Sequence, residues 1–182
     1  MKPKLIILSD LWGLNRSLWI QKYKKALQPN FKLRFYDSCE LAEIDNNNLS
    51  EHKIHELFLE NGITLAVRNL INLENDKINV LGFSIGGTIA WKAGLKGLKI
   101  DNFFTVSSTR LRYETERPNC KIKILFGDKD LFKPFKNWAD HLKLEMQILK
   151  DGDHEIYKND DFIEKLCTSI KYNAIFKDNT LI

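Results

Sequence analysis

Short, wholly apolar runs recur along the chain and alternate with longer segments of helical period. The runs at 5–8 (LIIL) and 103–106 (FFTV) lack polar alternation, which is typical of strands buried on both faces of a parallel sheet. We predict six strands, at residues 4–9, 31–37, 77–82, 101–107, 121–127 and 145–149.

The segments between these strands carry the signals of helices. We predict helices at residues 17–27, 50–73, 85–97, 134–144 and 160–172. Ser17 and Ser50 are the expected N-caps of the first two, Gly97 ends the third, and Asn61-Gly62 is expected to break the long second helix. The alternation predicts an α/β fold with a mostly parallel six-stranded sheet and helices on both faces. No linker or repeat divides the chain, so one domain is expected over residues 1–182.

The composition argues against three classes of protein: those that bind nucleic acid, those that span a membrane and those held by disulfides. The net charge is +4, from 28 basic and 24 acidic residues, and the lysines are scattered, so we expect no nucleic-acid partner. No segment approaches the ~20 apolar residues that span a bilayer. Cys39, Cys120 and Cys167 are odd in number, far apart and in no CxxC pair. We therefore expect a soluble cytoplasmic protein in a reducing compartment, without disulfides.

The sequence NVLGFSIGGTIA places Ser84 between a predicted strand and a predicted helix, with glycines at −2, +2 and +3. A serine on such a sharp turn is exposed beyond the sheet edge, and small residues at Gly82 and Gly86 avoid collisions with neighbouring elements. The backbone N–H of Ile85, at the start of the helix, points toward an oxyanion. Ser84 is therefore either a nucleophile or an N-capping serine in a small-residue turn.

A nucleophilic serine needs an imidazole base and a carboxylate that orients it. His52 and His55 lie in a charged helical segment before the serine, and His141 lies within a predicted helix. His154 instead follows the last predicted strand, in the loop DGDH. A side chain in that position can reach across the sheet edge, so His154 is the candidate base.

The acid is expected after the strand at 121–127, where FGDKDLFKP offers Asp130 and Asp128. We favour Asp130, because Asp128 fits an Asx turn after Gly127. Ser84, Asp130 and His154 would then each follow a successive predicted strand, at the edge where sites form in open α/β sheets. This order favours the nucleophile interpretation of Ser84.

With these residues in place, the chain resembles the α/β-hydrolase superfamily along nearly its whole length. The motif GFSIGG is followed by GDKD and then by GDH, and the Asp of the family's G-x-x-D corresponds to Asp130. The resemblance implies a serine hydrolase that cleaves a carboxylic ester or thioester without a metal or organic cofactor. The connection at 108–120 is too short for the cap domain of larger relatives, so the site is expected to be open.

The segment WGLNRSLW at 12–19 resembles pimeloyl-ACP methyl ester esterases of biotin synthesis. That resemblance implies that the Trp12 backbone N–H joins Ile85 in the oxyanion hole, and that the ester is carried by acyl carrier protein. The chain departs from the family at Asp10-Leu11, where His-Gly is usual.

Two further groups of residues carry candidate chemistry. Arg110, Arg112 and Arg117 are either a solvated connector or a docking site for an acidic carrier or its phosphopantetheine phosphate. His52 and His55 have no further ligands nearby in the sequence, so a surface-helix pair and no metal site are expected. The rival to an enzyme is a non-catalytic binding protein on the same fold, and a thioesterase or acyltransferase is a third alternative.

Overall fold

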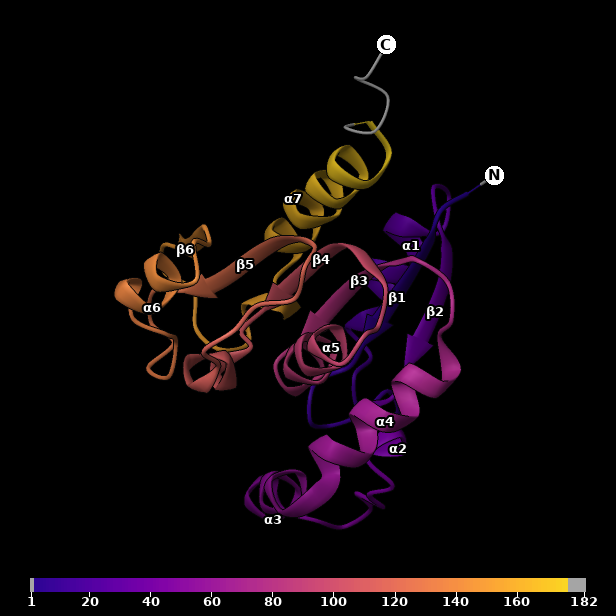
Figure 1. Cartoon of the computed structure of the whole chain (residues 1–182), viewed down its shortest axis with the longest axis vertical. Coiled ribbons are helices and arrows are strands. Elements are labelled where there is room, and N and C mark those ends of the chain that lie inside the picture. The colour runs from indigo at the N-terminus through magenta and orange to yellow at the C-terminus, as the bar shows by residue number, and fades with distance from the viewer. Residues whose placement is uncertain (1, 177–182) are drawn as a thin grey trace.

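The computed structural model describes residues 2–176, which form a six-stranded sheet flanked by helices (Figure 1). All strands are parallel, in the order β2-β1-β3-β4-β5-β6. Their bounds are Lys4–Leu8 (β1), Lys32–Tyr36 (β2), Ile78–Phe83 (β3), Ile100–Val106 (β4), Lys121–Gly127 (β5) and Met146–Leu149 (β6). All six predicted strands are confirmed, with ends that differ by one residue at most.

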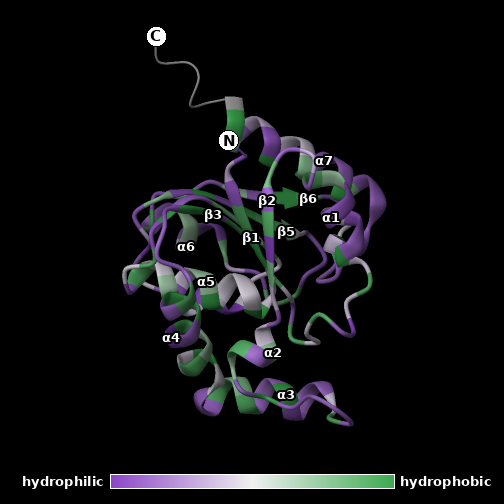
Figure 2. Ribbon diagram, turned by 90° about the vertical axis from the view of Figure 1, so that its right-hand side faces the viewer, coloured by the Kyte–Doolittle hydropathy of each residue, from purple (hydrophilic) through white to green (hydrophobic). Residues whose placement is uncertain are grey.

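Helices cover both faces of the sheet, as predicted. Their bounds are Ile20–Leu27 (α1), Ser38–Leu41 (α2), Glu51–Leu57 (α3), Ile63–Leu73 (α4), Ile85–Leu95 (α5), Lys136–His141 (α6) and Asp160–Lys171 (α7). Helices α1 and α7 bury their apolar faces against one side of the sheet, and α4 and α5 pack on the other. Figure 2 shows the two layers on opposite sides of the strands, with α2 and α3 beyond the strand ends.

The expectation for the second helix was wrong in one respect. Asn61-Gly62 does not break it, because α3 continues through a π-helical turn (η1, Phe58–Gly62) directly into α4. Gly62 keeps helical backbone angles, with φ −57° and ψ −41°. The Ser50 N-cap is confirmed, since its hydroxyl accepts a hydrogen bond from Lys53 N.

The Ser17 N-cap was also wrong. Helix α1 begins at Ile20, and its N-cap residue Trp19 makes no side-chain cap bond. The Ser17 hydroxyl instead donates to the buried carboxylate of Asp10, at 3.0 Å. Ser17, which the local sequence pattern predicts as a helix cap, thus makes a tertiary hydrogen bond instead.

The connection between β4 and β5 contains only a 3-10 turn (η2, Thr109–Tyr113), so no cap domain lies between these strands. Short 3-10 and π turns also stand at Ile156–Lys158 (η3) and Tyr172–Phe176 (η4). Within residues 2–176, no helix is both long and apolar enough to cross a membrane.

Candidate active site

Ser84 occupies the single residue between β3 and α5, in a strained backbone conformation. Its φ is +48° and its ψ −116°, a region that residues with a side chain rarely adopt. Holding such angles costs of the order of 1–3 kcal/mol, and the surrounding structure has to supply it. The Ser84 N–H donates to the carbonyl of Val106 at 2.9 Å, which ties the turn to β4.

Gly82 and Gly86 make this turn possible because, as predicted, neighbouring elements approach their Cα atoms too closely for a side chain. A Cβ on Gly82 would lie 2.5 Å from the Cα of Gly87, and one on Gly86 would lie 2.4 Å from the Ser9 carbonyl oxygen. Both contacts are with backbone, which cannot move aside cheaply. The small residues therefore bring the start of α5 down onto the ends of β1 and β3.

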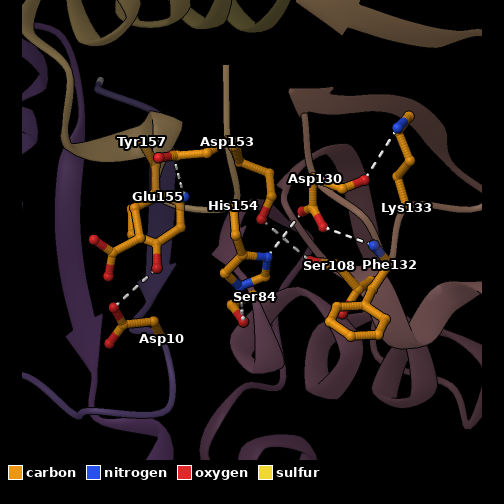
Figure 3. Close-up of polar contacts among 12 residues, drawn as sticks. Asp10, Ser84, Ser108, Asp130, Phe132, Lys133, Asp153, His154, Glu155 and Tyr157 are labelled. Carbon is orange, nitrogen blue, oxygen red and sulfur yellow. Dashed lines mark hydrogen bonds and ion pairs between the residues drawn. The ribbon is translucent and has the colours of Figure 1, made fainter. Parts of the chain in front are cut away.

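The structure brings together the three side chains that the sequence singled out (Figure 3). The Ser84 hydroxyl lies 3.1 Å from His154 Nε2, and His154 Nδ1 lies 2.8 Å from Asp130 Oδ2. Asp130 follows β5 and is buried, whereas the His154 side chain is 37% exposed. A hydrogen-bonded chain thus runs from a buried carboxylate through an imidazole to a hydroxyl at the protein surface.

This arrangement fixes how the protons are distributed in a neutral imidazole. If Nδ1 carries the proton that Asp130 accepts, the lone pair on Nε2 faces the Ser84 hydroxyl. The second oxygen of Asp130 accepts from the backbone N–H of Phe132 at 3.1 Å, which holds the carboxylate in place. This row of hydrogen-bonded side chains is chemically suited to removing a proton from Ser84.

The two predicted oxyanion donors differ in their surroundings. Ile85 is the first residue of α5, where the backbone N–H groups have no carbonyl partner within the helix. The Trp12 N–H, in contrast, donates to Asp10 Oδ1 at 3.0 Å. Trp12 could serve an oxyanion only by giving up that bond, and its role stays a prediction.

Asp10 organises this loop, and the sequence did not reveal that function. Its buried carboxylate accepts from Trp12 N, from the Ser17 hydroxyl and, at 3.2 Å, from the Tyr157 hydroxyl. Burial raises the pKa of Asp10, while these three hydrogen bonds act in the opposite direction. Burial, with the nearby Asp10 carboxylate adding to it, also raises the pKa of Tyr157, which therefore remains a donor.

Tyr157 connects this loop to the base. Its ring centroid lies 6.3 Å from that of His154, edge to face, and Figure 3 shows it between His154 and Asp10. No signal in the sequence marks Tyr157, because its partner Asp10 lies at the other end of the chain. Its position three residues after His154 was the only available hint.

The three arginines do not form one cluster. Arg110 and Arg112 lie on η2 and both approach the ring of Tyr113, with guanidinium carbons 5.1 and 4.4 Å from its centroid. Arg117 instead donates to the carbonyl of Lys143, in the turn before β6, at 3.3 Å. If these arginines bind a partner, they would do so at two separate places, one at Tyr113 and one at Lys143.

The histidine pair on α3 gains no metal-binding neighbours. Burial, with Arg110 adding to it, lowers the pKa of His55. Across the described residues, no three or more His, Cys, Asp and Glu side chains are grouped as a metal ion requires.

Comparisons with known proteins identify the fold. No family model and no curated protein sequence matches the chain. Among solved structures it is similar to a dienelactone hydrolase-like promiscuous phosphotriesterase from metagenomic libraries (TM-score 0.68, 12% identity, covering 95% of this chain and 85% of that one). It is also similar to ferulic acid-bound Est1E from Butyrivibrio proteoclasticus (TM-score 0.66, 14% identity, 98% and 91% covered).

A third similar structure is the mouse α/β hydrolase domain-containing protein 10, with a TM-score of 0.58, 16% identity, and 99% and 93% of the two chains covered. At such identities the similarity establishes the architecture alone. The chain has an α/β-hydrolase-like fold, and its structural neighbours include hydrolases and esterases.

Proposed function

We propose that this protein is a serine hydrolase that cleaves a carboxylic ester, or a thioester, through an acyl-enzyme on Ser84. The observation that carries the proposal is the continuous hydrogen-bonded chain from Asp130 through His154 to Ser84, with the serine held on a strained turn. A serine that merely capped α5 would not need this backbone strain, and its side chain makes no cap bond to the helix.

The reaction proceeds in two displacements. Ser84 Oγ attacks the ester carbonyl carbon while His154 Nε2 takes its proton, and the tetrahedral intermediate collapses as that proton passes to the departing alcohol or thiol. Water then attacks the acyl-enzyme, giving one proton to Nε2. The carboxylic acid leaves as that proton returns to Ser84 Oγ. Asp130 holds the imidazole in the required tautomer, and the reaction uses no metal or organic cofactor.

The oxyanion would be held by the backbone N–H groups of Ile85 and Trp12. Each such donor typically contributes about 3–4 kcal/mol to the transition state. Trp12 would have to exchange Asp10 Oδ1 for the oxyanion, which is easier when Asp10 is protonated and a poorer acceptor.

A fluorophosphonate probe tests the proposal directly. The wild-type protein should be labelled on Ser84, located by mass spectrometry of the modified peptide, and Ser84→Ala should abolish labelling. Ser169→Ala, on the distant helix α7, is the matched control and should label normally. A folded wild type that stays unlabelled would overturn the proposal.

The finer substrate proposal is a pimeloyl-ACP methyl ester, and it rests on the segment at residues 12–19 and on the basic side chains of the connection between β4 and β5. Arg110, Arg112 and Arg117 would bind the acidic carrier or its phosphate. Replacing all three with Ala should then slow hydrolysis of carrier-linked esters and spare a small free ester. Equal loss on both substrates would refute carrier docking.

A second candidate is a binding protein without catalytic activity. The observation that favours it is the occupied Trp12 N–H, which leaves Ile85 as the donor that needs no rearrangement. The same probe separates the two, because a binding protein would not be labelled. An acyltransferase on this scaffold would instead transfer the acyl group to an added alcohol in preference to water, and product analysis would reveal it.

A further inference from the structure

A group of large apolar side chains lies exposed on the loop that carries the candidate acid. Leu131, Phe132 and Phe135 are 88%, 63% and 83% exposed, and Tyr113 on the neighbouring η2 turn is 60% exposed. We call these four residues the aromatic rim. These side chains stay exposed in the folded protein, although burying their apolar surface away from water would be favourable in free energy.

The loop is held in a defined shape, so the exposure is not that of a loose segment. The Phe132 N–H donates to Asp130 Oδ1, and Lys133 Nζ donates to the carbonyls of Asp128 and Asp130, at 2.7 and 3.0 Å. Pro134 is buried beneath the loop. The rim is therefore attached directly to the acid of the candidate active site.

Arg112 joins the two halves of the rim. Its guanidinium donates to the Phe132 carbonyl at 3.3 Å and lies 5.6 Å from the ring centroid of Phe132. The same group donates to the hydroxyl of Tyr113 at 2.9 Å. A groove of about 460 Å³ lies alongside, lined in part by Tyr113, Phe135 and Trp138. The rim and this groove form one surface next to the candidate acid.

The charged side chains around the rim are mainly basic. The segment Leu131–Lys136 (LFKPFK) combines apolar and basic residues and contains no acid, and Arg110 and Arg112 lie on the other side. Glu114, which lines the groove, forms an ion pair with Lys92. Lys136 is exposed and makes no ion pair with any residue in the range 2–176. A second copy of this face would bring basic side chains against basic side chains. A lipid surface with anionic headgroups offers negative charge above an apolar layer, which matches both features.

We propose that the aromatic rim docks the protein onto anionic lipid surfaces, with Leu131, Phe132 and Phe135 inserted among the headgroups. Docking would place Ser84 close to amphiphilic esters in that surface. Such esters could then enter the open site directly, because no cap domain covers it. The delivery of such esters rests on the proposed hydrolase function, whereas the docking itself does not.

Vesicle binding tests the docking without reference to hydrolysis. Ser84→Ala protein is sedimented with vesicles of phosphatidylcholine alone, or of phosphatidylcholine mixed with an equal amount of phosphatidylglycerol. Binding should be strong only with the anionic mixture. Lys136→Gln should weaken it about fivefold, since one basic residue near such a surface contributes about that factor.

The double variant Leu131→Ser, Phe135→Ser should reduce binding roughly tenfold or more, because it removes most of the inserted apolar area. Leu73→Ser is the matched control, since Leu73 is 45% exposed but ends α4 at the opposite edge of the sheet. It should bind as the unmodified protein does. Melting temperatures of all variants are compared, and these exposed positions should leave them unchanged.

Four results would overturn the proposal. The anionic vesicles could bind the double variant and its parent equally, or bind neither. The rim could instead hold a second copy of the chain, seen as a dimer that the double variant dissociates. Hydrolysis of a short, freely dissolved ester by the otherwise wild-type enzyme should be unaffected by the double variant. A matching loss there would assign the rim to the ester pocket instead.

Discussion

The strained turn at Ser84 makes a prediction about stability that is separate from catalysis. Ser84→Ala and Ser84→Gly both remove the hydroxyl and its hydrogen bond to His154. The two variants differ in the backbone alone, because only glycine adopts φ +48° without a side-chain clash. We expect Ser84→Gly to be the more stable of the two.

The size of the difference follows from two opposing contributions. Releasing a residue from such a conformation is worth about 1–3 kcal/mol. Glycine also gains conformational freedom in the unfolded chain, which lowers the free energy of unfolding by about 0.5–1 kcal/mol. The net advantage of glycine is about 1 kcal/mol, which for a domain of this length shifts the melting temperature by about 2–4 °C.

Thermal unfolding followed by circular dichroism measures this difference. The same pair of substitutions at Lys165, an exposed position in α7, is the control and should give the opposite sign, with glycine about 1 kcal/mol less stable than alanine. If Ser84→Ala were as stable as Ser84→Gly, the turn would store no strain, and that part of our account of Ser84 would be refuted.

Three more predictions concern other parts of the structure. Asp130→Asn should lower kcat/KM on a soluble ester by about 10⁴-fold with folding intact, since an amide fails to fix the His154 tautomer; a loss below tenfold would exclude Asp130 as the orienting acid. Asp10→Asn should raise the melting temperature at neutral pH, because the raised pKa of Asp10 means that its ionised form is disfavoured in the folded protein. The advantage should fade as pH falls through that raised pKa toward the ordinary value of 3.8, and a pH-independent difference would contradict this reasoning. Burial raises the pKa of the thiols of Cys39, Cys120 and Cys167 to about 12, so none should react with a thiol reagent at mildly alkaline pH until the protein unfolds, and prompt reaction of the native protein would count against this.

The strands were predictable because a wholly apolar run leaves few alternatives once helical periodicity is missing. The juxtaposition of Ser84, Asp130 and His154 was also predictable, since parallel strands deliver the residues that follow them to one edge of the sheet. In both cases a local pattern and the topology pointed to the same answer.

What the sequence did not reveal depends on partners far along the chain. Ser17 carries a good local capping signal, yet its hydroxyl bonds Asp10 in the folded protein. Asp10 in turn bonds Tyr157, and no periodicity or spacing connects residues so distant. Helix α2 was missed because it is a single turn whose cap, Asp37, follows a strand directly.

The strand order has a consequence for synthesis on the ribosome. Beyond β3 the sheet grows by adding β4, β5 and β6 at one edge, in the order in which they are translated. Ser84 therefore emerges well before its base, and His154 becomes available only after β6 has been made. A nascent chain that has folded through β5 would present the serine turn without its imidazole. If Ser84 has the proposed nucleophilic role, it would gain its reactivity only when the last edge strand has joined the sheet.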